Sequence, residues 1–113
     1  MTVEELKEIG DFTPAVSADL AREIKSVYCC DLLSVVMGRA KAGCAWVTVM
    51  GSVNSVAVAV LADASCIVLA EGVPLDDAAK ERAEQKGVAV LKTALPVFEA
   101  GLKIHAELTR GAK

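Results

Sequence analysis

Two short apolar runs, and the spacing between them, limit the folds that are open to this chain. The run CAWVTVM occupies residues 44–50 and the run CIVLA occupies residues 66–70, and both are rich in the residue types of buried strands. Parallel neighbouring strands need a crossover connection of about a dozen residues, usually a helix. Residues 54–65 fill that gap. The spacing therefore predicts two parallel strands joined by a helix over residues 55–64.

The same alternation of strand and helix continues along the chain. A helix is expected to begin at the N-cap residue Thr2, with Glu5 completing a capping box. Pro14 limits residues 11–17 to a short edge strand or an extended link. From Ile24 onward we expect strands over 24–30, 44–50, 66–70 and 88–91, alternating with helices over 32–37, 55–64, 74–86 and 94–109, and a frayed tail over 110–113. Right-handed crossovers then give a three-layer α/β/α fold with a mainly parallel sheet of four to five strands.

Length and composition agree with this architecture. The chain has 113 residues, which suits one domain over residues 1–113. Hydrophobic residues make up 54% of it, yet only one Trp, one Tyr and two Phe are present, so the core must be built from small aliphatic side chains. Such cores are typical of parallel sheets that are covered by helices on both faces.

Charge and residue patterns exclude several classes of function. The net charge of -3 argues against a nucleic-acid partner. The apolar run 56–62 is too short to cross a bilayer, and the N-terminus lacks the layout of a signal peptide, so we expect a cytoplasmic protein with no membrane partner. The four cysteines form no CxxC pair, so no metal site, disulfide framework or cofactor is expected.

Polar residues follow the predicted strands, at the edge of the sheet where ligands bind in this fold class. Asp31 is placed to bind a ligand hydroxyl or a cation, or else to accept the helix amide of Leu33 or Ser34, which would make it an N-cap. The turn from Gly51 to Asn54 precedes a helix, so its amides can hold a phosphate or carboxylate, although every capped helix has such a turn. The candidate ligand-binding residues are Asp31, Ser34, Gly51, Ser52, Asn54, Glu71, Gly72 and Thr93.

No arrangement of residues in the sequence indicates catalysis. His105 is the only histidine, and it shares a stripe of the last predicted helix with Phe98 and Leu102, which favours a packing or interface role. Neither a Ser, His and Asp set nor a pair of carboxylates converges on a nucleophile. We therefore expect no catalytic residues and a protein that is not an enzyme.

Four segments together resemble the DRTGG domain, which is related to the N-terminal domain of HPr kinase/phosphorylase. They are CDLLSVVMG (30–38), AWVTV (45–49), the predicted helix before CIVLAEG (66–72) and GVAVLKTALPVFEAG (87–101), and the resemblance extends over residues 2–108. It implies an α/β/α domain that accompanies regulatory or catalytic partners, such as CBS-containing pyrophosphatases and phosphotransacetylases, and that associates as a dimer.

The chain departs from the family pattern in two places. The DRTGG sequence itself is missing, and residues 51–54 read Gly-Ser-Val-Asn where related domains often carry an Asp-Arg pair. No GxxxxGKS/T loop is present, so the kinase activity of full-length HPr kinase is not implied.

Two hypotheses for the function stay open at this point. The first is a regulatory or ligand-binding domain, dimeric, that senses a small anionic or nucleotide-like ligand at the carboxyl ends of the strands. The second is an assembly partner of a larger metabolic enzyme complex. An open polar cleft around Gly51 would favour the first, and exposure of Leu95, Phe98 and Leu102 would favour the second.

Overall fold

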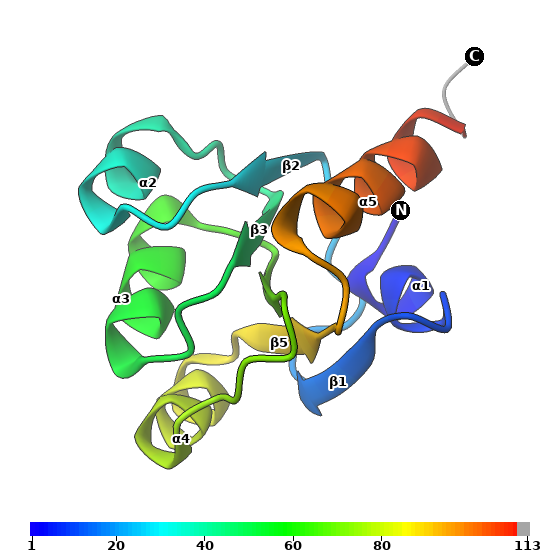
Figure 1. Ribbon diagram of the computed structural model, residues 1–113. Coiled ribbons are helices and arrows are strands. Elements are labelled where there is room, and N and C mark those ends of the chain that lie inside the picture. Colours follow the sequence, from blue (N-terminus) through cyan, green and yellow to red (C-terminus); the bar gives the residue numbers. More distant parts are fainter. Residues whose placement is uncertain (111–113) are drawn as a thin grey trace.

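The computed structural model describes residues 1–110, which form one five-stranded sheet with helices on both faces (Figure 1). The elements are α1 (Val3–Lys7), β1 (Thr13–Val16), β2 (Ser26–Cys29), α2 (Leu33–Arg39), β3 (Cys44–Thr48), α3 (Val53–Ala62), β4 (Cys66–Leu69), α4 (Asp77–Lys86), β5 (Ala89–Lys92) and α5 (Val97–Arg110). Of the tail that we expected to be frayed, Arg110 is the last residue of α5, and residues 111–113 lie outside the described part.

The sheet has the order β1-β5-β4-β3-β2. Strands β2, β3, β4 and β5 are parallel, and β1 pairs antiparallel with β5, where the register shifts between Pro14 and Val16. The predicted mainly parallel sheet is therefore confirmed, and β1 is an edge strand, as the proline indicated. The other edge of the sheet is β2.

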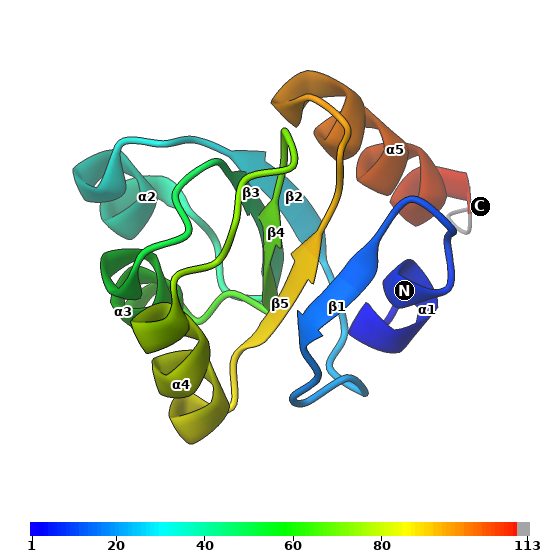
Figure 2. The same cartoon turned by 60° about the horizontal axis from the view of Figure 1, so that its bottom comes forward.

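Two helical layers cover the sheet, which completes the predicted three-layer fold. Helices α2, α3 and α4 lie on one face, over a core that contains Trp46, Val56 and Ala79. Helices α1 and α5 lie on the other, over a core that contains Val47, Leu91 and Ile104. Figure 2, turned by 60°, shows the strands between these two groups of helices.

Several predicted helix ends differ from the structure. The capping box of Thr2 and Glu5 is confirmed, and Gly87 ends α4 with φ 70°, in the left-handed region. Helix α5 begins at Val97 and not at residue 94, because a residue before proline is pushed into extended backbone and Pro96 places that restriction on residue 95. The side chain of Thr93 accepts a hydrogen bond from the Leu95 amide, in the turn before the helix.

The starts of α2, α3 and α4 also differ from those predicted. Helix α3 begins at Val53, two residues earlier than expected, and Ser52 occupies its N-cap position without a side-chain hydrogen bond. The N-cap position of α2 belongs to Leu32, so Asp31 does not cap that helix. Helix α4 begins at Asp77, which leaves Pro74 in the loop before it.

The buried Trp46 of β3 joins that strand to the end of β2. Its indole Nε1 donates a hydrogen bond to the carbonyl oxygen of Cys30 at 2.8 Å. The side chain itself is fully buried. Among residues 1–110, none of the helices has both the length and the apolar character that crossing a membrane requires.

Candidate functional site

The carboxyl ends of the four parallel strands bring the predicted loops to one edge of the sheet. Because β5 and β4 are neighbours in the sheet, the loop after β5 lies beside the loop after β4. Two backbone hydrogen bonds join these loops: the amide of Glu71 donates to Leu95 O, and the amide of Gly72 donates to Thr93 O. The loop after β4 also reaches the loop after β3, where the amide of Asp76 donates to Gly51 O at 2.8 Å.

Asp31 binds the neighbouring strand and not its own helix. Its Oδ1 accepts a hydrogen bond from the Thr48 hydroxyl at 2.7 Å and another from the Val49 amide at 3.0 Å. Thr48 is fully buried, so its hydroxyl needs this acceptor. Asp31 is therefore a structural link between the ends of β2 and β3, a role that differs from the predicted N-cap.

The turn at Gly51 is closed by the loop before α4. A Cβ atom placed on Gly51 would lie 2.2 Å from the backbone oxygen of Pro74, which is far inside van der Waals contact. The hydroxyl of Ser55 turns back to donate to Met50 O at 2.6 Å. Glycine is required at position 51 because another segment of backbone packs directly against it.

One shallow groove reaches two of the predicted residues. Gly72 and Thr93 line it together with Asp11, Thr13, Lys92 and Ala94, and its volume is about 300 Å³. Lys92 supplies a positive charge there, whereas Asp11 pairs with Lys103 of α5. Ser34 and Asn54 are exposed on the first turns of α2 and α3, away from the residues that line this groove.

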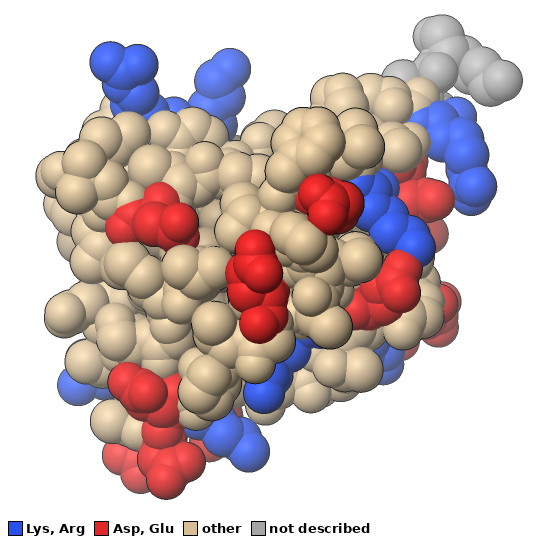
Figure 3. All heavy atoms as spheres, in the orientation of Figure 1, with Lys and Arg blue, Asp and Glu red and all other residues tan. Residues whose placement is uncertain are grey.

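Charged groups do not form a broad basic patch over this side of the molecule. Figure 3 shows acidic and basic groups scattered over an otherwise uncharged face, in the orientation of Figure 1. Two of the loops at the carboxyl ends carry an acidic residue, Asp31 and Glu71. A multiply charged anion would therefore meet little electrostatic attraction at this edge.

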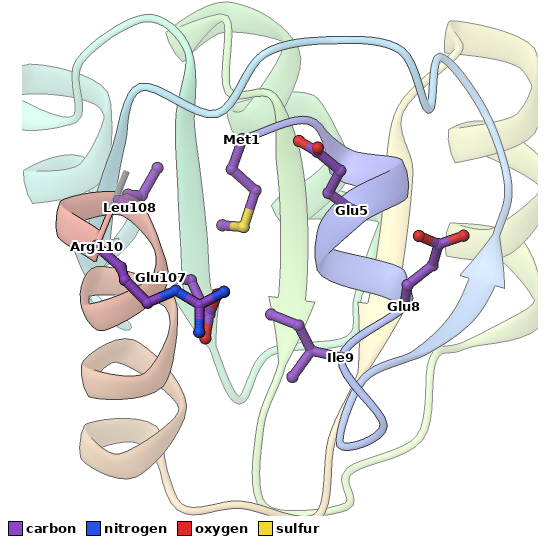
Figure 4. A pocket seen from close by; sticks show the side chains of 7 residues that line it. All are labelled: Met1, Glu5, Glu8, Ile9, Glu107, Leu108 and Arg110. Carbon is purple, nitrogen blue, oxygen red and sulfur yellow. The ribbon is translucent and has the colours of Figure 1, made fainter. Parts of the chain in front are cut away.

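A second groove, which the sequence did not indicate, lies between α1 and α5 (Figure 4). Its volume is about 680 Å³, and it is lined by Met1, Glu5, Glu8, Ile9, Glu107, Leu108 and Arg110. The Arg110 side chain pairs with Glu107, and Glu5 accepts a hydrogen bond from the Thr2 amide. These residues come from the segment 1–9, which contains α1, and from the last turns of α5, whereas the predicted loops lie where α5 begins.

The most exposed apolar side chains of α5 lie beside the open edge of the sheet. Phe98 is 71% exposed and Leu102 is 53% exposed, and Leu95 is half-buried. Gly101 packs against β2 so closely that an added Cβ would lie 2.6 Å from Cys29 Sγ. Residues 98 and 102 lie next to Gly101 on the helix surface, on the flank of α5 that faces the β2 edge. Lys103 lies on the opposite flank, where it pairs with Asp11. We call Phe98, Leu102 and the outer edge of β2 the β2-edge surface.

Three cysteines, Cys29, Cys44 and Cys66, lack the features of a reactive thiol. Burial and the nearby carboxylate of Asp31 raise the pKa of Cys29 above its ordinary value. Burial also raises the pKa of Cys44, and it raises the pKa of Cys66 to about 12. These three side chains are therefore uncharged at neutral pH, and the thiolate is the nucleophilic form. Within residues 1–110, no three His, Cys, Asp or Glu side chains gather where they could hold a metal ion.

Comparison with known proteins gives a likeness that concerns the fold. Neither a family model nor a curated protein sequence matches the chain. Among solved structures, the fold is similar to that of a regulatory region. This is the CBS and DRTGG domains of the regulatory region of Clostridium perfringens pyrophosphatase, solved in complex with its activator diadenosine tetraphosphate.

The likeness to that regulatory region has a TM-score of 0.64 at 11% sequence identity. It covers 88% of this chain and 44% of the pyrophosphatase fragment, so the chain spans less than half of its solved neighbour. The predicted three-layer fold, resembling that of a DRTGG domain, is thus supported by a solved structure.

Proposed function

We propose that this chain is a non-catalytic regulatory module that acts by binding a protein through the β2-edge surface. The observation that carries the proposal is the exposure of Phe98 (71%) and Leu102 (53%) beside an unpaired strand edge. Adjacent exposed apolar side chains at one site mark contact surfaces in proteins that are otherwise well packed. A second copy of the chain and a larger metabolic enzyme are the two classes of partner.

The geometry of the carboxyl-end loops supports this choice over ligand binding. Pro74 packs against Gly51, where an open polar cleft would have favoured a ligand. Oδ1 of Asp31 already accepts hydrogen bonds from the Thr48 hydroxyl and the Val49 amide. These groups stabilise the fold, and a ligand would have to displace them.

A photo-crosslinking amino acid at position 98 tests the proposal in cells that make the protein. We expect covalent adducts with a protein when the photoreactive side chain replaces Phe98. Gln85 is the matched control position, because it is exposed on α4, on the opposite face of the sheet. Equal adduct yields at positions 98 and 85, or none at either, would contradict a contact role for this surface.

A nucleotide-binding role is the second candidate, favoured by one observation. The fold is similar to that of a regulatory region solved with diadenosine tetraphosphate, and the groove beside Gly72 and Thr93 contains Lys92. If the groove binds such a ligand, diadenosine tetraphosphate or AMP should raise the melting temperature of the wild type, and Lys92→Glu should abolish the increase. Lys86→Glu, which changes an exposed lysine at the last turn of α4, is the matched control.

A further inference from the structure

The groove between α1 and α5 is a feature that the proposed function does not use (Figure 4). We propose that it is a second contact site, which binds a segment of another protein in which apolar side chains are flanked by lysine or arginine. The α5 residues of the groove begin at Glu107, further along the helix than Leu102. The groove and the β2-edge surface therefore share a helix but no residue.

The floor of the groove is apolar. Met1, Ile9 and Leu108 line it, and each of them is half-buried because it also packs against the core beneath α1 and α5. Figure 4 shows the side chains of Met1 and Ile9 pointing into the space between the two helices. The volume of about 680 Å³ is within the range of about 300–1,000 Å³ that is typical of binding pockets. The floor can therefore take up apolar side chains of a partner.

Carboxylates lie on both walls of the groove. Glu5 and Glu8 come from the α1 side, and Glu107 comes from α5. Within residues 1–110, neither Glu5 nor Glu8 forms an ion pair, although Glu5 accepts the hydrogen bond of the capping box. Among the side chains that line the groove, three carboxylates are thus matched by one guanidinium, that of Arg110. This excess of negative charge favours a cationic partner over an anionic one.

Arg110 indicates how the cation of a partner is held. Its guanidinium lies 3.3 Å from a carboxylate oxygen of Glu107, and its side chain extends from α5 toward the space between the helices (Figure 4). The side chain of Arg110 is 79% exposed, so solvent screens this ion pair and the pair contributes little to stability. An incoming lysine or arginine can therefore replace Arg110 beside Glu107 at little cost in free energy.

The combination of an apolar floor and acidic walls favours a protein segment over a small polyamine. The methylene chain of a polyamine carries no side chains that would fill the floor formed by Met1, Ile9 and Leu108. A segment with leucines between lysines matches both the floor and the walls. Docking of an amphipathic segment in an apolar groove is a recurring mode of peptide recognition.

An NMR titration of the isotope-labelled full chain measures the binding and locates it. The probe is the peptide Lys-Leu-Leu-Lys, capped at both ends and added at low salt. We expect a dissociation constant of about 1 mM or tighter, with shifts confined to amides of α1 and of the last turns of α5. Added salt should weaken the binding. The matched peptides Glu-Leu-Leu-Glu and Lys-Ser-Ser-Lys should each bind roughly tenfold more weakly, because the first reverses the charge and the second removes the apolar side chains.

Variants of the two members of one ion pair should change the affinity in opposite directions. Glu107→Gln removes a carboxylate and should weaken the binding of Lys-Leu-Leu-Lys by about 3- to 10-fold, whereas Arg110→Ala frees that carboxylate and should strengthen it about 3-fold. An ion pair with only a structural role would not give opposite signs. Glu8→Gln should weaken binding as Glu107→Gln does. The matched control is Glu84→Gln, an exposed glutamate of α4 on the other side of the sheet, which should leave the affinity unchanged.

Several results would overturn the groove as a protein contact site. They are the absence of saturable shifts at millimolar peptide, equal binding of the three peptides, and equal weakening by Glu8→Gln and Glu84→Gln. Spermine is tested in the same way. If it bound as tightly as Lys-Leu-Leu-Lys and needed the same carboxylates, the occupant would be a small amine and not a protein segment. None of these results depends on Phe98, so this inference and the proposed function can fail separately.

Discussion

The carboxylate of Asp31 accepts a hydrogen bond from the hydroxyl of Thr48 at 2.7 Å, across the ends of two parallel strands. Because Thr48 is fully buried, its hydroxyl would have no acceptor in an Asp31→Ala variant. We expect the free energy of unfolding to fall by about 1–3 kcal/mol, as measured by urea titration. In a Thr48→Val background the same change should cost less, because the buried hydroxyl is gone. Equal losses in both backgrounds would contradict a direct coupling.

Replacing Gly51 should show that the turn after β3 is closed. Gly51→Ala would place Cβ 2.2 Å from Pro74 O, and we expect a loss of roughly 1–3 kcal/mol in the free energy of unfolding. Gly38→Ala is the matched control, because Gly38 lies in α2 and an added Cβ there meets nothing within 4 Å. That change should stabilise the protein by about 0.5–1 kcal/mol. If both variants gained stability, the turn would be open.

The buried thiol of Cys66 should make stability fall at alkaline pH. Burial raises its pKa from 9.0 to about 12, so the unfolded chain loses this proton at a lower pH than the folded protein. The contribution of the buried, protonated Cys66 thiol to the free energy of unfolding is complete below about pH 9 and is lost as the pH rises toward 12. Over this window, the slope of the unfolding free energy against pH should be about 1.4 kcal/mol per unit steeper for the wild type than for Cys66→Ala. The free energies are measured by urea titration in the presence of a phosphine reductant. If the curves of unfolding free energy against pH were parallel for the wild type and Cys66→Ala, this prediction would be wrong.

The ion pair between Asp11 and Lys103 should contribute little. Both side chains are more than a third exposed, so solvent and salt screen the pair. Asp11→Asn should lower the free energy of unfolding by less than about 1 kcal/mol, with the difference shrinking at high ionic strength. A loss that is larger and independent of salt would assign Asp11 a structural role beyond this pair.

The strands could be predicted well from the sequence because their signals are local. Strand β3 was expected over 44–50 and spans Cys44–Thr48, and β4 was expected over 66–70 and spans Cys66–Leu69. In each case a short apolar run lies next to glycine, serine or a polar turn, and the crossover length decides that the strands are parallel. The capping box at Thr2 is likewise contained within four residues.

The loops at the carboxyl ends could not be predicted equally well, because their partners are distant in the sequence. Asp31 looks like a helix cap in its own segment, but its oxygen binds Thr48, seventeen residues away. Gly51 looks like an open phosphate-binding turn until Pro74 packs against it. The late start of α5 is different, because Pro96 was a local signal that could have placed it. Whether the eight predicted residues bind a ligand stays a prediction.

The hydrogen bond from Trp46 to Cys30 makes the chain its own optical reporter. This indole is the only one in the protein, so its fluorescence comes from a single point at the end of β2. Any event that frays the end of this strand disturbs the carbonyl that the indole binds and should change the emission of Trp46. Stopped-flow fluorescence can therefore time the opening of this strand end without an attached dye.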